Sequence, residues 1–345
     1  MDDPLPERIS TADKQCSLAR SVAMRRYNRP VISSKLVSLQ GTDSITLEVA
    51  MQDHPDVIVQ FRAESFDITP FKIARKLLGS AVPSIEIFND DEDGGFRCVL
   101  MSKMAGGTWF DIEDIWKENN FIKSATGLGE VMSHCFVPSD NRSIEGHIIP
   151  RLQGILTMET RCGINVTRYF PLVRDLITAS ERLGDLPSFF SHPDLNPMNI
   201  FVSKCGDLEG LIDWDGSLVL PFGVSSWAIH FLAGQFLTMD DGEIGFVERP
   251  FYERIERAFW EALIKNAPEE LVDQPHNKME LLQLAVIVGT VIGVLGIDDE
   301  NGTQISDLHV PSLRALPRLL RYRIPFVRGA TETPFGASEY QIQLD

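Results

Sequence analysis

Three oxygen-bearing side chains in the middle of the chain have the types and spacing that phosphoryl transfer requires. Asp194 and Asn199 lie on one loop, which Pro193 and Pro197 mark, and Asp213 follows beyond an apolar segment. Carboxylate and amide oxygens are hard ligands, and Mg²⁺ usually takes one or two carboxylates and completes its shell with substrate phosphates and water. We therefore expect Asn199 and Asp213 to hold magnesium and Asp194 to accept a proton from a substrate hydroxyl.

The residues between these groups predict a β-hairpin. Residues 199–202 (Asn-Ile-Phe-Val) form a short apolar strand, Gly206 and Asp207 are turn residues, and residues 208–212 form the returning strand. Asn199 then opens one strand and Asp213 follows the other. Because a hairpin brings its outer ends together, both side chains are expected within reach of one cation.

The order and spacing of these residues resemble those of a known enzyme family. Residues 192–200 (HPDLNPMNI) and 211–215 (LIDWD) are similar to the catalytic loop and the metal-binding segment of the aminoglycoside phosphotransferase and choline kinase family. The two segments occur together and in the family's order, which makes the pair more specific than either motif alone. The resemblance implies an α+β protein-kinase-like fold with two lobes, a small antiparallel β-rich lobe followed by a larger, mainly helical lobe.

The resemblance also implies an activity and a role for each site residue. It implies a kinase that uses ATP and Mg to phosphorylate a hydroxylated small molecule. Asp194 would be the catalytic base, His192 a residue that braces the loop, and Asn199 and Asp213 the magnesium ligands. Asp215 is placed either to act as a further carboxylate around the metal or to cap the segment that follows.

The first third of the chain has the pattern of a kinase small lobe. Strand-rich segments are separated by turn signals, and one helical segment is inserted among them and ends at Gly79. The expected strands are residues 36–40, 44–51, 56–62, 84–88 and 96–101. The expected organisation is a polar lead-in with one helix (1–32), a nucleotide-binding lobe (33–104), a catalytic and substrate lobe (105–322) and a tail (323–345).

Five small-lobe residues are candidate nucleotide contacts. Gly41 lies in the turn expected to cover the phosphates, and Ser102 and Met104 belong to a hinge whose backbone is expected to bind adenine. Members of the family normally present a Lys, or sometimes an Arg, from the third strand, where this chain has Gln60. Arg62 shares a strand face with Gln60 because side chains alternate along a strand. Arg62 either supplies the missing positive charge or points to water from the rim.

The departure at Gln60 leaves two functions open. In the family, a Glu on the following helix braces the strand Lys, but residues 68–78 contain no carboxylate, and only Glu64 and Asp67 lie nearby. One interpretation is an active phosphotransferase with a rebuilt small lobe. The other is a kinase-fold binding module that has lost transfer, or that catalyses a different, ATP-independent reaction on a small metabolite. Protein kinase activity is not indicated, since the sequence has no HRD or DFG tripeptide.

The amino-acid composition limits the kinds of binding partner and the cellular compartment that we expect. The net charge of −17 argues against a nucleic acid or an anionic membrane surface as partner. Five scattered cysteines without a CxxC pair, and an acidic, polar N-terminus, predict a cytoplasmic protein.

Residues 281–297 are uncharged, yet they are short for a membrane span and run into acidic residues, so a buried helix that packs closely at its glycines is expected. Residues 110–119 are acidic and aromatic, and they form either part of a substrate wall or a solvated helix. Residues 238–243 form an acidic turn, which the resemblance makes a candidate for binding substrate amines and which is otherwise a solvated loop.

Overall fold

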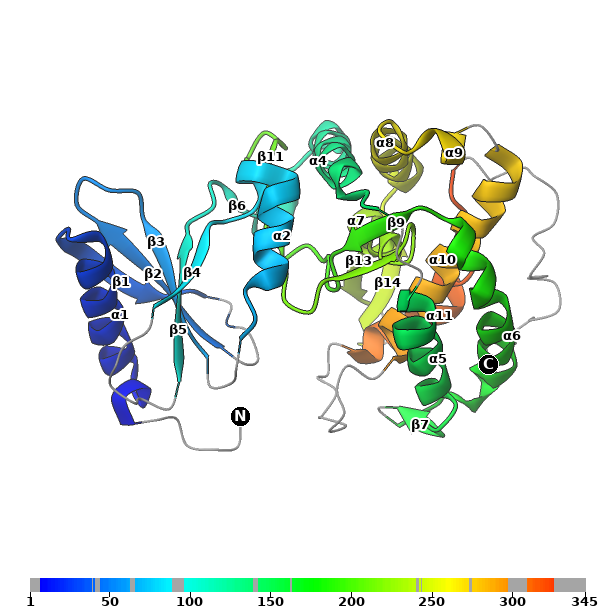
Figure 1. The fold of residues 1–345 in the computed structure, drawn as a ribbon, viewed down its shortest axis with the longest axis horizontal. Coiled ribbons are helices and arrows are strands. Elements are labelled where there is room, and N and C mark those ends of the chain that lie inside the picture. The colour runs from blue at the N-terminus through cyan, green and yellow to red at the C-terminus, as the bar shows by residue number, and fades with distance from the viewer. Residues whose placement is uncertain are drawn as a thin grey trace.

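The chain folds into two lobes that lie side by side along the long axis of the molecule (Figure 1). The computed structural model describes residues 7–38, 40, 44–62, 66–88, 96–138, 142–161, 163–239, 242, 244–272, 275–296 and 309–325. A short connection after Ser102 leads from the small lobe to the large lobe. The predicted fold class, with an antiparallel β-rich N-terminal lobe and a helical C-terminal lobe, is confirmed.

A five-stranded antiparallel sheet forms the small lobe. Its order is β1-β2-β3-β5-β4. The strands are β1 (Val31–Leu36), β2 (Ser44–Met51), β3 (Val57–Arg62), β4 (Ile85–Phe88) and β5 (Arg97–Ser102). Burial alternates along β3, so that Val57, Val59 and Phe61 face a core while the residues between them are half-buried. The period of two in the apolar residues therefore fixes which face of this strand is covered.

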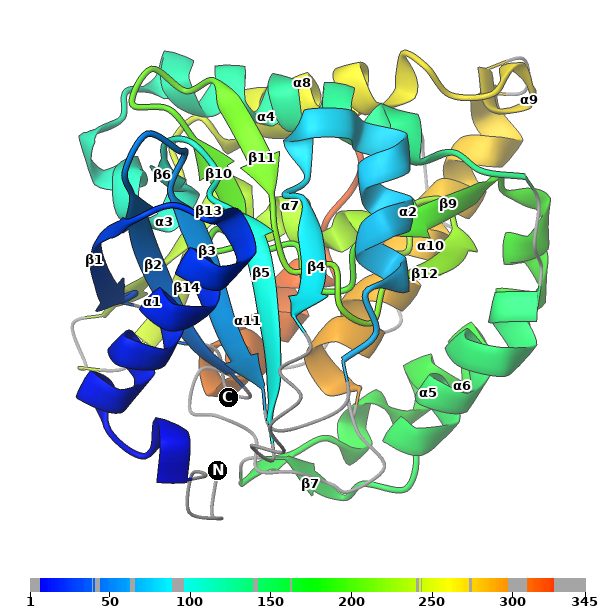
Figure 2. The same ribbon diagram turned by 60° about the vertical axis from the view of Figure 1, so that its left-hand side comes forward.

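Helix α1 (Ala12–Tyr27) covers that apolar face of the sheet (Figure 2). Ala19, Val22 and Ala23 are buried in the same cluster as Val59 and Phe61. The helix begins at the Thr11 cap, whose hydroxyl accepts a hydrogen bond from the backbone N–H of Lys14. Residues 1–32 were expected as a separate lead-in, and this expectation is wrong for the described part, because α1 supplies one layer of the small-lobe core.

The first strand lies earlier in the chain than the predicted 36–40. The pairing of β1 with β2 ends where Leu36 lies opposite Leu47. Beyond it, the Gln40 side chain takes over as a hydrogen-bonding partner of β2, donating to the Thr46 carbonyl and accepting from the Thr46 N–H. The Val37 N–H also donates to the Thr46 carbonyl at 3.1 Å. One backbone hydrogen bond and the Gln40 side chain thus continue the contact with β2 at the position where the apolar pattern predicted a strand.

Helix α2 (Thr69–Leu78) links the two lobes. The Asp67 carboxylate accepts a hydrogen bond from the Thr69 N–H at the start of the helix, and Gly79 ends it with a φ of 61°. Phe71 and Ala74 are buried in a cluster that continues into the large lobe. The predicted helix and its end at Gly79 are confirmed.

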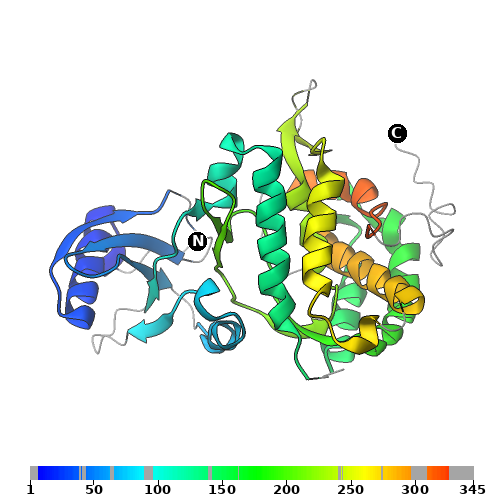
Figure 3. The ribbon, with the colours of Figure 1, turned by 90° about the horizontal axis from the view of Figure 1, so that it is seen from above.

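The large lobe is built from helices around a long central one. Helices α4 and α8 lie side by side (Figure 3). The helices are α3 (Trp109–Ile112), α4 (Glu118–Met132), α5 (Ile149–Ile155), α6 (Phe170–Ala179), α7 (Ile229–Ala233), α8 (Tyr252–Ile264), α9 (Glu269–Val272), α10 (Pro275–Leu295) and α11 (His309–Leu319). The strands are β6 (Gly107–Thr108), β7 (Thr160–Arg161), β8 (Ile164–Asn165), β9 (Ser188–Ser191), β10 (Ile200–Val202), β11 (Leu208–Leu211), β12 (Leu218–Pro221), β13 (Gly234–Thr238) and β14 (Ile244–Glu248).

Hairpin β13–β14 was not predicted. Helix α7 ends at Ala233, and β13 begins at the next residue. Phe236 lies directly opposite Phe246, with ring centroids 5.4 Å apart. Such aromatic cross-strand pairs stabilise two-stranded ribbons. They join residues on two different strands, so the local spacing of apolar residues along one segment does not reveal them.

Helix α10 forms the centre of the large lobe. Residues 278–295 are long and apolar enough to cross a membrane, and 78% of that stretch is buried inside the protein. The two glycines of the helix allow close contact with the preceding segment. A Cβ added at Gly289 would lie 1.7 Å from the Val224 carbonyl oxygen, and one at Gly293 would lie 2.2 Å from the Trp227 ring. The prediction of a buried core helix with close packing at its glycines is confirmed.

Replacement of Gly289 by alanine is expected to destabilise the protein. The added methyl group would meet backbone atoms that cannot rotate away, and overpacking of this kind costs about 1–3 kcal/mol, more than the roughly 1 kcal/mol gained in helix propensity. The matched control is Gly154→Ala in α5, where an added Cβ meets nothing within 4 Å. Thermal denaturation should show a lower melting temperature for G289A and an equal or higher one for G154A; equal melting temperatures for G289A and the unsubstituted protein would contradict this packing.

Candidate active site

The catalytic loop joins β9 to β10 and holds its polar groups by internal hydrogen bonds. Asp194 is exposed, whereas Asn199 is buried. The Asn199 amide Nδ2 donates to the Asp194 backbone oxygen at 2.8 Å and to carboxylate Oδ2 of Asp194 at 3.2 Å. No other described residue donates a hydrogen bond to the Asn199 Oδ1 atom. The amide nitrogen therefore fixes the carboxylate, while the amide oxygen keeps its lone pairs for another ligand.

The predicted hairpin is confirmed, with a bulge near its turn. Ile200 of β10 pairs with Leu211 of β11, and the Ile212 N–H donates to the Asn199 carbonyl at 3.0 Å. Asn199 thus lies across from the residue that precedes Asp213. Asp213 itself has a φ of 61°, in the left-handed region that residues other than glycine seldom adopt. Such backbone conformations occur preferentially at functional sites, where the surrounding structure holds them in place.

His192 links the start of the catalytic loop to the end of the hairpin. It is buried, its Nε2 lies 2.7 Å from the Ile212 carbonyl oxygen, and its Nδ1 accepts from the Asp194 N–H at 3.2 Å. Both contacts are satisfied by a neutral ring with the proton on Nε2. Burial lowers the pKa of His192, although the Ile212 carbonyl and the Asp194 charge oppose this effect. The geometry fits the bracing role expected of His192, since the ring contacts backbone on both sides.

Acidic charge is concentrated around Asp213. Solvent reaches its carboxyl group, but neighbouring protein atoms partly bury it, and this burial raises its pKa to about 6. The Asp194 carboxylate raises the pKa further, the Arg62 guanidinium lowers it, and Asp215 raises it. The site therefore holds more negative charge than its own residues neutralise, which favours a bound cation.

The raised pKa of Asp213 predicts how stability depends on pH. Because the folded-state pKa lies above the unfolded value near 3.9, the folded protein binds more protons between about pH 4 and 6, and its free energy of unfolding falls as pH rises through that window. Without metal, Asp213→Asn should melt at a higher temperature than the unsubstituted protein at about pH 7.5, and the difference should shrink towards about pH 4.

Thermal melting in EDTA across this pH range measures the effect of Asp213→Asn. The control is Asp13→Asn, which makes the same chemical change at an exposed position in α1. If the melting temperatures of the unsubstituted protein and of D213N change in parallel with pH, this would contradict the raised pKa of Asp213.

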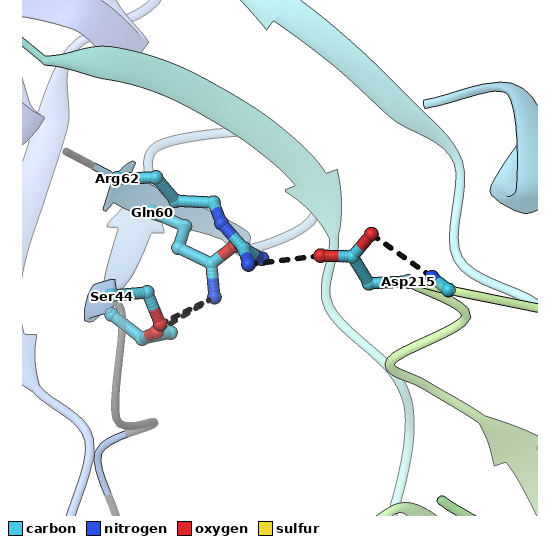
Figure 4. A network of polar contacts seen from close by, with 6 residues as sticks. Ser44, Gln60, Arg62 and Asp215 are labelled. Carbon is cyan, nitrogen blue, oxygen red and sulfur yellow. Dashed lines mark hydrogen bonds and ion pairs between the residues drawn. The ribbon is translucent and has the colours of Figure 1, made fainter. Parts of the chain in front are cut away.

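Arg62 reaches from the small lobe to the large lobe (Figure 4). Its Nη2 lies 3.0 Å from Asp215 Oδ2, and its side chain is only 16% exposed. Its Cζ lies 4.2 Å from the centroid of the Phe66 ring, a cation–π contact. Gln60, on the same strand face, donates to Ser44 and lies 3.5 Å from an Arg62 nitrogen. Arg62 therefore points into the space between the lobes, and the interpretation that it faces water is wrong.

The two residues expected in the hinge, Ser102 and Met104, differ in whether their hydrogen-bonding groups are free. The Ser102 N–H donates to the Ser84 carbonyl at 3.0 Å, and its hydroxyl accepts from the Ser84 N–H at 2.9 Å. Ser102 thus belongs to the sheet, and these groups are not free for adenine, which corrects the expectation for this residue. The Met104 N–H and carbonyl form no hydrogen bond with any described residue. Met104 therefore keeps a free backbone donor and acceptor beside the hairpin, where its side chain packs against Gly210.

Two small-lobe predictions lie outside the described residues, namely those on Gly41 and Glu64. Asp67, the other candidate for a rebuilt brace, instead forms a hydrogen bond at the start of α2. The sequence analysis also missed Phe66 as the ring beneath Arg62. The only sign of this contact in the sequence is that an aromatic residue follows Arg62 a few positions later.

The donor set suits magnesium rather than zinc. Within the described ranges, no group of three or more His, Cys, Asp and Glu side chains is arranged to hold a metal by itself. An amide oxygen on Asn199 and the carboxylates of Asp213 and Asp215 form instead an incomplete set of hard oxygen ligands. Mg²⁺ typically binds to such a set together with substrate phosphates.

Solved structures of small-molecule kinases share this architecture. An ethanolamine kinase from Plasmodium vivax matches with a TM-score of 0.56 at 14% identity, over 91% of this chain and 90% of that chain. A thermostable mutant of an aminoglycoside phosphotransferase, in complex with AMP-PNP and hygromycin B, matches at 0.56 and 12% identity, over 91% and 99%. A spectinomycin phosphotransferase, in complex with ADP and spectinomycin, matches at 0.52 and 13% identity, over 90% and 96%.

These matches define the fold. It is protein-kinase-like, with the small β-rich lobe and the helical lobe in the expected order. Within that class it is the fold of the aminoglycoside phosphotransferase and choline kinase family, as the catalytic loop predicted. No protein-family model matches the sequence, and a search of curated proteins found no match.

Proposed function

We propose that this chain is an ATP- and Mg²⁺-dependent phosphotransferase that phosphorylates a hydroxyl group of a small molecule. The observation that carries the proposal is the junction of the catalytic loop with hairpin β10–β11. There the buried Asn199 amide fixes the exposed Asp194 carboxylate, and the hairpin places Asp213 beside them. This combination supplies a base and two kinds of hard oxygen ligand in one place, as phosphoryl transfer requires.

Each residue takes a role that follows from its surroundings. The exposed Asp194 carboxylate accepts the proton of the acceptor hydroxyl as that oxygen attacks the γ-phosphorus and ADP leaves. Asn199 and Asp213 would hold magnesium, and Asp215, whose carboxylate pairs with Arg62, would add a further negative charge near them. A bound magnesium ion neutralises charge on the phosphate oxygens. Arg62 supplies the positive charge that members of the family usually carry two residues earlier in the strand, at the position of Gln60.

Similar solved structures support nucleotide use. They include phosphotransferases in complex with ADP or with AMP-PNP, and their acceptors are small molecules such as spectinomycin and hygromycin B. In this chain, the Met104 N–H and carbonyl form no hydrogen bond with any described residue, which supports a role for them in binding an adenine ring.

One observation favours a rival function, a kinase fold that binds ligands without transferring phosphate. The Gln60 amide nitrogen donates to Ser44 and Thr46, at 3.0 and 3.2 Å, so the usual cation position holds a neutral side chain already engaged within the sheet. No acidic residue among those described in α2 braces a strand cation. The rival stands only if Arg62 does not replace the missing charge.

A screen of hydroxylated metabolites for ADP formation tests the proposal. The protein is incubated with Mg²⁺, ATP and each metabolite, and ADP is measured by a coupled assay, with a matched series in EDTA. We expect acceptor-dependent ADP formation that EDTA abolishes. If the protein binds Mg·ATP but none of the acceptors leads to ADP formation, the rival is correct. ADP formation that is equal in EDTA would contradict the role of magnesium.

A further inference from the structure

The solvent-facing surface of the catalytic loop is largely apolar. Between residues 193 and 198, Asp194 is the only ionisable residue. Pro193 is exposed, Pro197 is half-buried, and the Met198 side chain is 40% exposed although it lies next to the buried Asn199. The Asn196 Oδ1 atom accepts a hydrogen bond from the Met198 N–H at 2.8 Å, which leaves the Asn196 amide nitrogen as the one other polar side-chain group of this stretch.

A second exposed apolar side chain adjoins this loop. The Phe110 N–H donates to the Pro197 carbonyl at 3.1 Å, which attaches the start of α3 to the loop. The Phe110 side chain is 53% exposed, whereas its neighbour Trp109 is fully buried and packs edge-on against Trp116 with ring centroids 5.2 Å apart. Trp109 thus anchors the helix and leaves Phe110 at the surface, with its backbone bonded to the residue that precedes Met198. Asp111, the next acid, is engaged with the Thr108 hydroxyl at 2.7 Å.

Exposed large apolar side chains that adjoin a reactive group usually mark a ligand surface. A polyhydroxylated or polycationic acceptor would need several hydrogen-bonding partners around the base, and between residues 193 and 198 the loop carries only the Asp194 carboxylate and the Asn196 amide. An alcohol attached to an aromatic or aliphatic body would instead bury Phe110 and Met198 while its hydroxyl meets the carboxylate. We propose that the acceptor of this phosphotransferase is an alcohol with an apolar body, bound by Phe110 and Met198; this inference rests on the proposed function.

The test uses the full chain and a fluorescent probe alcohol, 2-naphthaleneethanol. Its binding is titrated by fluorescence without nucleotide. Phe110→Ser and Met198→Gln are each expected to weaken binding by about tenfold, because each removes apolar contact area from the complex. The matched controls are Ile32→Ser and Met24→Gln, which change exposed apolar residues on the small lobe and should bind the probe as the unsubstituted protein does. Unchanged binding in F110S and M198Q, or equal losses in the controls, would overturn the assignment.

A second arm separates this inference from the proposed function. With Mg·ATP, phosphate transfer to 2-naphthaleneethanol is compared with transfer to choline and to kanamycin. Preference for the naphthyl alcohol, with KM raised in F110S and M198Q, supports the apolar acceptor. Preference for kanamycin or choline would overturn it while upholding the phosphotransferase. Probe binding that depends on Phe110 and Met198, without transfer to any of the three, would support the apolar site and count against the transfer reaction.

Discussion

Replacement of Asp194 by asparagine is expected to lower kcat by about 10²–10⁴-fold, the usual contribution of a positioned general base. Asparagine is nearly isosteric, and its amide oxygen can still accept the hydrogen bond that the Asn199 amide donates to the carboxylate. The loop geometry should therefore persist while the proton acceptor is lost. The affinity for Mg·ATP should change little, because Asn199 and Asp213 are retained. Steady-state kinetics with an accepted alcohol, together with nucleotide titration, measure both quantities.

The control for this prediction is Asp13→Asn, which removes the same charge from the exposed surface of α1. It should retain full turnover. Full activity in D194N would show that another group accepts the proton, and it would withdraw the role assigned to this carboxylate. A comparable loss in D13N would indicate that net charge, rather than the catalytic loop, controls the rate.

Replacement of Arg62 by glutamine is expected to lower kcat/KM by about 10²–10³-fold, the cost typical of removing one group that stabilises transition-state charge. Arg62 is the cation that the β3 face directs between the lobes, held by Asp215 and by the Phe66 ring. Without it, the phosphates would face the carboxylates of Asp213 and Asp215 with magnesium as the principal source of positive charge. Nucleotide affinity should fall as well, since the ground-state phosphates are also anionic.

A compensating substitution makes this prediction specific. Adding Gln60→Lys to the Arg62→Gln variant places a cation at the position that the family normally uses, on the same face of β3. We expect part of the lost kcat/KM to return, whereas Lys35→Gln, a charge change on the exposed side of the small lobe, should have little effect. Retained activity in R62Q would contradict the assignment of Arg62.

Local signals in the sequence predicted the centre of the site well. Two prolines and a short apolar hairpin with a glycine turn fix where Asp194, Asn199 and Asp213 lie, and each of these signals acts over only a few residues. The helix ending at Gly79 was predictable for the same reason. The sequence therefore contains enough information for the catalytic loop, because its geometry depends on contacts between near neighbours.

Features that depend on distant contacts could not be predicted in the same way. The Arg62–Asp215 ion pair joins residues 153 positions apart, so no local pattern could distinguish an arginine at the rim from one between the lobes. The packing of α1 on the sheet, the earlier position of β1 and the β13–β14 hairpin also depend on partners elsewhere in the chain. Ser102 was misassigned because its pairing with Ser84 extends the sheet one residue further than the apolar pattern indicated.

The most direct test of the account is thermal unfolding with nucleotide and metal varied independently. The central claim of the account is that Asn199 and Asp213 hold magnesium against bound ATP phosphates. Mg·ATP at a hundredfold over its Kd should raise the free energy of unfolding by about 2.7 kcal/mol, whereas ATP in EDTA or Mg²⁺ alone should give much smaller shifts, and D213N should lose the difference between ATP with and without metal. An equal shift with and without Mg²⁺, or none at millimolar Mg·ATP, would contradict it.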